Sequence, residues 1–298
     1  MASVAFIGLG NMGAPMAANL VKAGYNVQGY DLLPANAQRA EATGVTLTPS
    51  ARDAVANADT VITMLPAGRH VVSVVEDILP TLPAGTLLID CSTIDVITAR
   101  IVHELCTKAE VASIDAPVSG GVGGAEAGTL TFMAGGEDDA FARARAILEP
   151  MAGRIVHCGA GGAGQAAKIC NNMLLGISMI GTAEAFVLAE KLGLSHQALF
   201  DVASTSSGRC WSLDTYCPVP GPVPTSPANR NYEPGFAAAL MLKDLKLAQE
   251  AAATNNAQTP LGAEAMQLYS LFAAHDGAGR DFSAIIEFLR GRGVDPAS

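Results

Sequence analysis

Short apolar runs alternate with segments of helical periodicity through the first half of the chain. The apolar runs are bounded by turn residues and predict buried strands, whereas the intervening segments repeat their apolar residues every three or four positions, as amphipathic helices do. The predicted strands are Val4–Ile7, Val27–Tyr30, Val61–Leu65, Leu87–Ile89 and Val111–Ile114, with helices such as Pro15–Lys22 and Thr98–Lys108 between them. Strands that alternate with helices predict βαβ units and a parallel sheet.

The pattern changes after a glycine cluster at residues 159–164. Before it, two further β-like segments, Leu130–Ala134 and Ile155–His157, flank a helix around Ala140–Leu148. After it, we expect one long helix over Gln165–Leu192, roughly 42 Å at 1.5 Å per residue, and then helices at Ser195–Ser204, Ala237–Thr254, Pro260–His275 and Phe282–Arg290. The prediction is an α/β domain at residues 1–162 and an all-helical domain at residues 163–298, joined by the long helix.

The segment from Ser207 to Gly235 does not fit this scheme. It contains six prolines, which exclude a helix, and a long structureless segment in a compact chain is usually functional or disordered. Because the segment also holds the single tryptophan, Trp211, we interpret it as an ordered loop with a binding role. A packed loop that binds no ligand is the alternative.

Composition and charge exclude several classes of function. Hydrophobic residues make up 50% and charged residues 15% of the 298 positions, which excludes a disordered chain. The 18 basic and 28 acidic side chains give a net charge of −10, so neither a nucleic acid nor an anionic membrane is expected as a partner. A site for a small anion must then supply its own positive groups or backbone N–H donors. The scarcity of charge favours a homo-oligomer.

Cysteine spacing and targeting features point to a soluble protein of the cytoplasm. The six cysteines form neither a CxxC pair nor a zinc-ligand pattern, so we expect free thiols and no metal site. The longest apolar stretch, residues 169–183, includes two asparagines and is too short and polar to cross a bilayer. The first residues lack a basic region or a cleavage site.

A glycine-rich motif follows the first predicted strand and opens the first predicted helix. It reads Gly8-Leu9-Gly10-Asn11-Met12-Gly13 and matches G-x-G-x-x-G in the strand–turn–helix context that dinucleotide binding requires. The first glycine allows the tight turn, the second lets the backbone approach a pyrophosphate, and the third lets helix and strand pack closely. The motif therefore predicts a Rossmann-type, doubly wound sheet. A structural turn without a ligand is the alternative.

The residue at the end of the second predicted strand indicates which dinucleotide binds. Asp31 lies 18 residues after Gly13, where a carboxylate accepts hydrogen bonds from the adenosine ribose hydroxyls. A 2′-phosphate would meet that carboxylate at a cost of about 1–4 kcal/mol at 4 Å, and neither Leu32 nor Leu33 is an arginine that would offset it. We therefore expect NAD rather than NADP.

A lysine early in the long predicted helix is the main candidate for catalysis. Gly164, Lys168 and Asn172 are spaced by four residues and share one helix face. No other charged residue occurs between Lys168 and Glu184. Burial disfavours the ammonium form and favours an amine that accepts a proton, as alcohol oxidation requires. A boundary lysine that extends its ammonium group to water is the alternative.

Two further segments carry candidate binding groups. Ser119 with the backbone N–H groups of Gly120 and Gly121 follows a strand and suits a carboxylate; a turn without a ligand is the alternative. Phe236 and Lys243 lie seven residues apart, which predicts two turns along one helix face. A solvated charge pair is the alternative reading of Lys243-Asp244.

These motifs together resemble those of the β-hydroxyacid dehydrogenases. The resemblance spans essentially the whole chain and rests on four blocks in order, namely residues 8–13, 115–121 and 164–172 and Lys243-Asp244-Leu245. Within that family the chain looks most like the 3-hydroxyisobutyrate dehydrogenases, on the basis of residues 208–212, residues 218–221, and Asn231-Tyr232 shortly before Gly235-Phe236.

The resemblance implies roles for individual residues. It makes Lys168 the catalytic acid/base and places the substrate at Ser119, Gly120, Gly121, Asn172, Trp211 and Phe236. It adds Leu65, Pro66, Thr93 and Lys243 to the NAD contacts and implies a homodimer or homotetramer assembled through the helical domain.

The reaction implied is the NAD-dependent oxidation of a small β-hydroxy acid, 3-hydroxyisobutyrate, to methylmalonate semialdehyde in valine degradation. A reductase of tartronate or succinic semialdehyde is the alternative within the family, although Asp31 suits it less well. A non-catalytic dinucleotide-binding protein is a more remote alternative, because such a protein has no need of Lys168.

Overall fold

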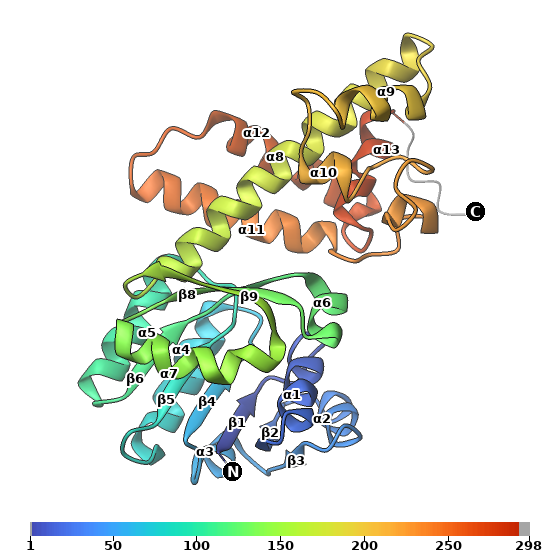
Figure 1. The fold of residues 1–298 in the computed structure, drawn as a ribbon. Coiled ribbons are helices and arrows are strands. Elements are labelled where there is room, and N and C mark those ends of the chain that lie inside the picture. The colour runs from blue at the N-terminus through green and yellow to red at the C-terminus, as the bar shows by residue number, and fades with distance from the viewer. Residues whose placement is uncertain (1, 292–298) are drawn as a thin grey trace. The chain divides into compact units, whose positions relative to one another are not determined.

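The computed structural model describes residues 2–291 of the chain. These residues form two compact units, one ending at Lys168 and the next beginning at Ile169 (Figure 1). Helix α8, Ala163–Lys191, includes residues of both units. The domain division expected from the sequence, after residue 162, precedes this boundary and stays a prediction.

The first unit contains a nine-stranded sheet with the order β3-β2-β1-β4-β5-β6-β8-β7, and β9 pairs with β8. The strands in the first part of this order, β3 to β6, all run parallel in the 3-2-1-4-5-6 order of doubly wound dinucleotide-binding sheets. The predicted fold is therefore confirmed. The strands are β1 Ser3–Ile7, β2 Asn26–Tyr30, β3 Thr46–Leu47, β4 Thr60–Thr63, β5 Leu87–Asp90, β6 Ala112–Asp115, β7 Val118–Ser119, β8 Leu130–Gly135 and β9 Ala152–Gly159.

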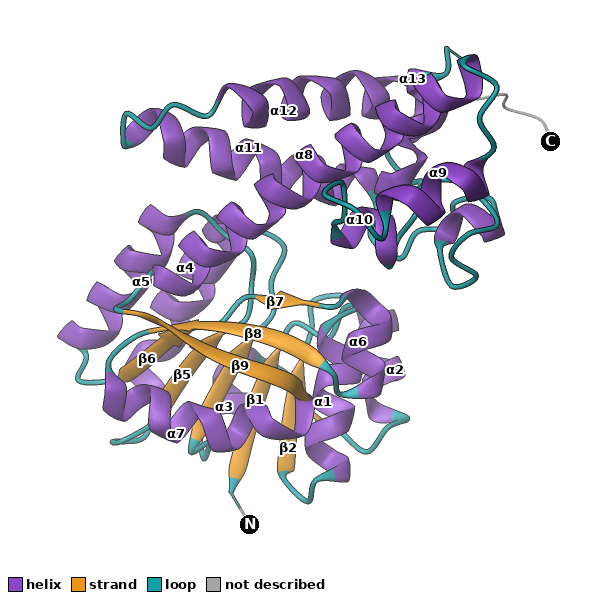
Figure 2. Cartoon of the chain, turned by 45° about the horizontal axis from the view of Figure 1, so that its top comes forward, coloured by secondary structure: helices purple, strands orange, loops and turns teal. Residues whose placement is uncertain are grey.

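Beyond β6 the sheet also contains antiparallel pairs, which the alternation of strands and helices did not specify. Strand β8 runs antiparallel to β6 and β7, whereas β9 runs parallel to β8 (Figure 2). The chain reverses between β7 and β8 through the short helix α6, Gly121–Ala127, which ends at Gly128 in a left-handed conformation.

Helices cover both faces of the sheet because successive side chains of its central strands point to opposite sides. In β1, Val4 and Phe6 belong to one core cluster, whereas Ala5 and Ile7 belong to another. Asp95 caps helix α5, Val96–Lys108, by accepting a hydrogen bond from the Thr98 N–H. The other helices that cover the sheet are α1 Gly13–Lys22, α2 Pro34–Glu41, α3 Ala51–Val55, α4 Gly68–Ile78 and α7 Asp138–Leu148.

Strand register brings the ends of the parallel strands to one edge. Ile7 pairs with Tyr30 and Thr63, Thr63 pairs with Asp90, and Asp90 pairs with Asp115. The residues that follow these five positions include most of the cofactor contacts predicted from the sequence. This carboxyl edge is where open α/β sheets bind their ligands.

The second unit consists of helices around a separate apolar core. That core includes the fully buried Met179, Phe186, Met241, Tyr269 and Phe272, contributed by α8, α11 and α12. The helices are α9 His196–Ala203, α10 Trp211–Asp214, α11 Ala238–Thr254, α12 Pro260–Phe272 and α13 Ile285–Leu289.

Two details of the helical prediction are wrong. The proline-rich segment contains the short helix α10 and a 3₁₀ turn at Pro227–Arg230. Helix α10 ends before the first proline, and Pro227 stands at the first position of its turn, where proline is tolerated. Phe236 precedes α11, so it does not share a helix with Lys243. The backbone N–H groups of Gly235 and Phe236 instead donate to Asp281 Oδ2 at 3.0 and 3.1 Å, which holds this stretch outside the helix.

Helix α8 is, within residues 2–291, the one helix long and apolar enough to span a membrane by length and composition alone. The apolar stretch found in the sequence, residues 169–183, is shorter than α8, which extends beyond it at both ends. Core helices of soluble proteins meet the same criteria, and α8 contributes Met179, Ala183 and Phe186 to the core of the second unit. Packing therefore accounts for the apolar character of the face of α8 that carries these three residues.

Candidate active site

The glycine-rich turn has the geometry that each of its glycines was predicted to need. Gly8 has φ +96°, and a Cβ there would lie 2.3 Å from the Met64 carbonyl oxygen. A Cβ on Gly13 would lie 1.9 Å from the Gly8 oxygen. A Cβ on Gly10 would meet no protein atom within 4 Å, so protein packing does not require glycine at that position. The bare backbone at Gly10 leaves the space that a pyrophosphate occupies in such turns.

The helix after this turn favours an anion mainly through its dipole. In its first turn the Ala14 N–H already donates to the Gly10 carbonyl at 3.0 Å, and Pro15 has no N–H. The positive end of the helix dipole suits a phosphate. The turn therefore fits a dinucleotide.

Asp31 holds the turn in place from the end of β2. Its Oδ2 accepts the Leu9 N–H at 2.7 Å, and its Oδ1 accepts the Leu33 N–H at 2.8 Å and the Asn36 amide at 3.2 Å. The side chain is half-buried, whereas Leu32 beside it is 82% exposed. The carboxylate thus orders the glycine-rich turn and also presents charge at the strand end.

The ends of β4 and β5 are tied together by buried polar groups. The Thr63 hydroxyl donates to Asp90 Oδ1 at 2.7 Å, and the Ser92 N–H donates to the same oxygen at 3.1 Å. The Leu65 N–H donates to the Ser92 hydroxyl at 2.8 Å. These bonds fix the positions of three predicted cofactor contacts at the edge of the sheet: Leu65 and Thr93, which are partly buried, and Pro66, which is exposed.

Asp90 has an unusual protonation equilibrium for a carboxylate. Burial raises its pKa to about 6, against the lowering effect of hydrogen bonds from Ser92 and Thr63. Its second oxygen is buried and has no hydrogen-bond partner within the described residues. Asp90 therefore changes charge near neutral pH at the edge where the cofactor is expected.

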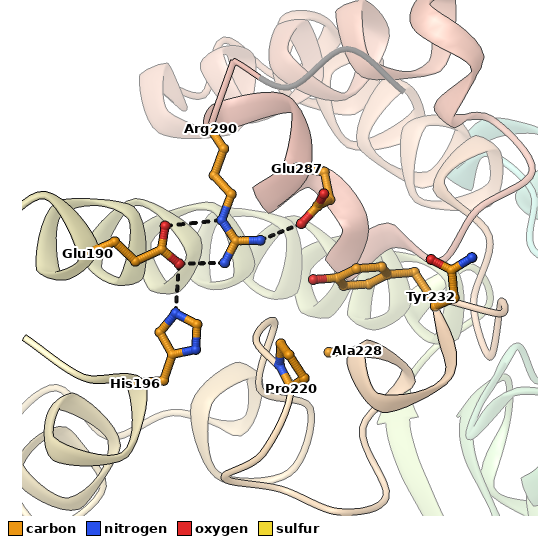
Figure 3. Close-up of a pocket in the computed structure, with 8 residues that line it drawn as sticks. Glu190, His196, Pro220, Ala228, Tyr232, Glu287 and Arg290 are labelled. Atoms are coloured by element: carbon orange, nitrogen blue, oxygen red, sulfur yellow. Dashed lines mark hydrogen bonds and ion pairs between the residues drawn. The ribbon is translucent and has the colours of Figure 1, made fainter. Parts of the chain in front are cut away.

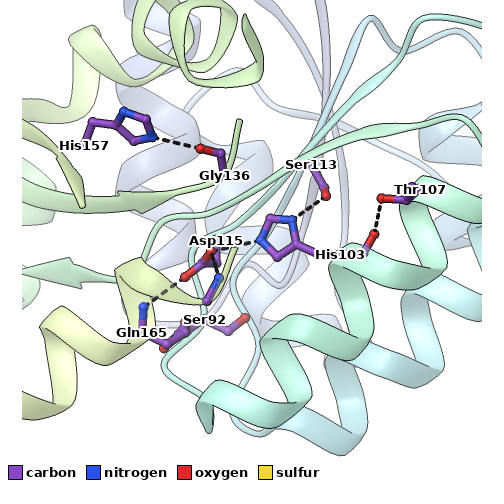
Figure 4. A network of polar contacts seen from close by, with 9 residues as sticks. Ser92, His103, Thr107, Ser113, Asp115, Gly136, His157 and Gln165 are labelled. Atoms are coloured by element: carbon purple, nitrogen blue, oxygen red, sulfur yellow. Dashed lines mark hydrogen bonds and ion pairs between the residues drawn. The ribbon is translucent and has the colours of Figure 1, made fainter. Parts of the chain in front are cut away.

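A second polar network anchors the start of α8 to this edge. Asp115 accepts the Gly162 N–H at 2.7 Å, the Gln165 N–H at 2.9 Å and a contact from His103 Nε2 at 2.9 Å (Figure 4). His103 is held in turn by Ser113 at 2.8 Å. The carboxylate of Asp115 thus caps α8 with a charge that favours a helix N-terminus.

Lys168 follows this anchor by one turn of α8. Its side chain is 6% exposed, and the side chain of Asn172, one turn further on, is 2% exposed. A Cβ on Gly164 would lie 2.2 Å from the Met133 oxygen, so glycine is needed there for α8 to approach β8. The face shared by Gly164, Lys168 and Asn172 is therefore a buried face of the helix.

Asn172 belongs to a buried polar cluster with α11. Its Nδ2 donates to Asp244 Oδ2 at 2.5 Å, and its Oδ1 accepts the Asn171 amide at 2.9 Å. Lys243 Nζ lies 3.7 Å from Asp244 Oδ1, and Asp244 is 3% exposed. Asp244 is therefore not solvated as the alternative reading of this pair required, whereas the Lys243 side chain is 35% exposed.

Ser119 and the two glycines after it lie at the edge strand β7. Gly120 and Gly121 have φ +135° and +63°, conformations that side-chain-bearing residues avoid. Ser119 is partly buried and pairs with Thr131 of β8. The turn therefore presents a hydroxyl and two closely spaced backbone N–H groups.

Trp211 and Phe236 are linked by an aromatic chain in the helical unit. Trp211, 49% exposed, stacks on Tyr216 at 4.8 Å; Tyr216 stacks on Phe282 at 5.3 Å; and Phe236 meets Phe282 edge-on at 5.7 Å. The Tyr216 hydroxyl donates to Asp281 at 2.9 Å. Burial, reinforced by Asp281, raises the pKa of Tyr216 well above its ordinary value, so Tyr216 stays a hydrogen-bond donor.

Family models match both parts of the chain. Residues 3–159 match the NAD-binding domain of 6-phosphogluconate dehydrogenase, and residues 162–289 match the domain described as the NAD-binding domain of NADP-dependent 3-hydroxyisobutyrate dehydrogenase. A Mycobacterium tuberculosis protein named probable 3-hydroxyisobutyrate dehydrogenase is 58% identical over 98% of this chain and 99% of its own. The chain belongs to the 3-hydroxyisobutyrate dehydrogenase family.

Further relatives agree with this membership. A solved structure of Mycobacterium tuberculosis 3-hydroxyisobutyrate dehydrogenase with L-serine has a TM-score of 0.95 and 57% identity, over 97% of this chain and 99% of that one. A Pseudomonas aeruginosa protein named NAD-dependent L-serine dehydrogenase is 48% identical over 96% of this chain and 97% of its own. The prediction of an NAD-binding oxidoreductase of the β-hydroxyacid dehydrogenase type is confirmed.

A pocket in the helical unit of this family member involves none of the predicted site residues. It is lined by Glu190, His196, Tyr232, Glu287 and Arg290 among others (Figure 3). Arg290 donates to both oxygens of Glu190 and to Glu287. The charged residues that line the pocket therefore form a structural ion-pair network. It joins the end of α8 to the last helix.

Sequence reasoning missed the residues that position the predicted site. The side chain of Gln165 contacts Ile94 and Ser92, which lie 71 and 73 positions away, and a local motif does not show such contacts. His103 contacts Asp115 and Ser113 across a helix–strand connection. Asp90 and Asp115 are the last residues of β5 and β6, and a buried carboxylate at a strand end indicates partners of this kind. Across residues 2–291 no cluster of three potential metal ligands occurs.

Proposed function

We propose that this protein oxidises 3-hydroxyisobutyrate to methylmalonate semialdehyde with NAD, a step of valine degradation. The observation that carries the proposal is Lys168, a buried lysine anchored one turn after the carboxyl edge of a dinucleotide-binding sheet. The names of the family members that are similar over nearly the whole chain support the choice of substrate.

The chain's own residues would divide the chemistry as follows. A bound NAD would supply the hydride acceptor for the oxidation of the carbinol carbon. Lys168 accepts the proton of the substrate hydroxyl in that oxidation and returns it in the reverse reaction. Ser119 and the N–H groups of Gly120 and Gly121 hold the substrate carboxylate. Asn172, fixed in orientation by Asp244, donates to or accepts from the substrate hydroxyl.

Trp211 and Phe236 are proposed to contact the apolar part of the substrate. The aromatic chain between them fixes Trp211 against Tyr216. The methyl group of 3-hydroxyisobutyrate suits such a surface, because it gains from leaving water.

We assign NAD as the preferred dinucleotide on the basis of Asp31. The carboxylate disfavours a 2′-phosphate, although the name of the second matching family model mentions NADP. Gly8, Leu9, Gly10, Asn11, Met12 and Gly13 would bind the pyrophosphate, and Leu65, Pro66, Thr93 and Lys243 would complete the cofactor contacts.

L-serine is the second candidate substrate. It is also a β-hydroxy acid, and two relatives are named with it, one as an L-serine dehydrogenase and one in a structure with L-serine. L-serine carries an ammonium group where 3-hydroxyisobutyrate carries a methyl group. Whether the residues around this position are polar or apolar therefore decides between the two substrates.

A substrate panel tests the proposal. Turnover of 3-hydroxyisobutyrate, L-serine and glycerate is measured with NAD and with NADP. We expect the highest kcat/KM with 3-hydroxyisobutyrate and NAD. A higher value with L-serine would make this chain a serine dehydrogenase, and a higher value with glycerate would support the tartronate semialdehyde alternative.

We also propose that the chain forms a homodimer or homotetramer in the cytoplasm. Leu174, Gly181 and Leu188 of α8 are exposed and lie seven residues apart, which gives the helix one unpartnered apolar stripe. All six cysteines are free thiols, as is usual in a reducing compartment. Sedimentation analysis of wild type and a Leu174→Glu variant tests the oligomer; equal masses at the monomer value would contradict it.

A further inference from the structure

Gln165 is a fully buried amide at the start of α8 that the proposed chemistry does not use. Its side chain is 0% exposed. Its backbone N–H is already occupied by Asp115 Oδ2, at 2.9 Å. The backbone of this turn is therefore anchored without any help from the side chain.

The side-chain amide of Gln165 holds the loop after β5 at two points. Its Oε1 accepts the Ile94 N–H at 3.1 Å, and its Nε2 donates to the Ser92 carbonyl at 2.7 Å. These two residues flank Thr93. The Ser92 hydroxyl accepts the Leu65 N–H at 2.8 Å, so the contact extends to the loop after β4. Thr93 and Leu65 are both proposed cofactor contacts.

Lys168 follows Gln165 by three residues on the same helix. Residues three apart on a helix face are neighbours, with about 5–6 Å between their Cβ atoms. One side chain therefore connects the loops that would carry the cofactor to the turn that carries the proposed acid/base.

We propose that Gln165 is a positioning residue that sets the register between the cofactor-contacting loops and the Lys168 amine. The inference rests on the proposed function. Hydride and proton leave the same carbinol group, so the cofactor and the amine must be held at fixed positions relative to each other. A displacement of about 1 Å costs on the order of 100-fold in rate.

The test compares Gln165→Met with a matched control, Gln249→Met. Methionine keeps the length of the side chain and removes both hydrogen bonds, and Gln249 is a partly buried glutamine of α11. Kinetics with 3-hydroxyisobutyrate and NAD, NADH affinity and Tm are measured for each. For Gln165→Met we expect kcat to fall about 10- to 100-fold, while KM and the NADH Kd change less than about threefold. The control should keep kcat within about twofold of wild type.

Gln165→Glu adds a readout that a merely structural role would not move. A protonated glutamic acid donates to the Ser92 carbonyl as the amide does, whereas the carboxylate faces that oxygen without a proton. Relative to wild type at each pH, kcat of Gln165→Glu should rise as pH falls, and that of Gln165→Met should stay flat.

The outcomes separate this inference from the proposed function. An active wild type whose Gln165→Met variant keeps its kcat overturns the inference alone. So does a Gln165→Glu variant whose relative kcat is as flat with pH as that of Gln165→Met. A wild type that turns over no β-hydroxy acid overturns the proposed function and this inference with it.

Discussion

Asp31 combines two roles in one carboxylate, since it orders the glycine-rich turn and sets charge at the end of β2. We expect Asp31→Ala to lower the ratio of kcat/KM with NAD to that with NADP by about tenfold, because a repulsion of about 1–4 kcal/mol is removed. Weaker binding of both cofactors should accompany the change, because the Leu9 N–H loses its acceptor. The measurement is steady-state kinetics with each cofactor.

The matched control is Asp53→Ala, which removes an exposed carboxylate near the start of α3. It should leave the cofactor ratio unchanged. If Asp31→Ala also leaves the ratio at the wild-type value, another residue determines the preference.

Ser119 is expected to act on binding rather than on the chemical step. A hydroxyl that holds the substrate carboxylate contributes similarly to the ground state and the transition state. Ser119→Ala should therefore raise KM about tenfold and lower kcat less than threefold. Ser73→Ala, an exposed serine of α4, serves as the control. A fall in kcat with an unchanged KM would contradict carboxylate anchoring by Ser119.

The residues that could be predicted are those whose chemistry is local. The backbone geometry of the glycine-rich turn depends on Gly8, Gly10 and Gly13, which all lie within one short motif. Lys168 stands out because its helix has no other charged residue nearby in the sequence. The positioning roles of Gln165 and Asp115 could not be predicted, because each residue hydrogen-bonds to partners about 50 to 70 positions away in the sequence. The roles of the binding residues stay predictions.

Helix α13 is attached to α8 by the ion-pair network of Arg290. The guanidinium side chain is 11% exposed and bonds Glu190 and Glu287. Removing it takes the arginine partner from two partly buried carboxylates and leaves Glu190 with His196, 2.7 Å away, so Arg290→Ala should cost about 2–4 kcal/mol and lower Tm by on the order of 5–10 °C. Arg52→Ala, which breaks an exposed pair with Asp77, should change Tm by less than about 2 °C.

The effect of Arg290 depends on pH in a defined direction. Hydrogen bonding from Arg290 lowers the pKa of Glu190 below its ordinary value. A carboxylate with a lowered pKa stabilises the fold above its unfolded-state pKa and loses that contribution as pH falls through the folded-state value. The difference in Tm between wild type and Arg290→Ala should therefore be largest near neutral pH and shrink on acidification. A constant difference would mean that the arginine stabilises mainly through packing.

At the scale of elements, periodicity predicted the existence of the long ones and missed the short ones. Apolar runs in the sequence indicate helix α8 and the strands β1 to β6, apart from β3. Strands β3 and β7 are two residues each and have no period to detect. The antiparallel direction of β8 depends on the glycine-assisted reversal after β7, which the alternation of strands and helices does not encode.

At the scale of the whole molecule, the family motifs predicted the pairing of a dinucleotide-binding unit with a helical unit. Strands β2 and β3 are added in turn on one side of β1, whereas β4, β5 and β6 are added on the other side. The glycine-rich turn follows β1 and therefore lies at the point where the strand order reverses, which is where such sheets bind their ligands. Polar networks then attach the start of α8 to the carboxyl edge of the sheet. Lys168 is buried one turn after this attachment, where we propose that it serves as acid/base.

The most direct test of that claim is the kinetics and cofactor binding of Lys168→Ala, with Lys191→Ala, an exposed lysine of the same helix, as the control. With 3-hydroxyisobutyrate and NAD, we predict that kcat of Lys168→Ala falls by about 10²- to 10⁴-fold, while NADH affinity stays within about threefold of wild type and Lys191→Ala matches wild type. A Lys168→Ala variant that keeps its turnover, or one that loses NADH binding instead, would contradict the account.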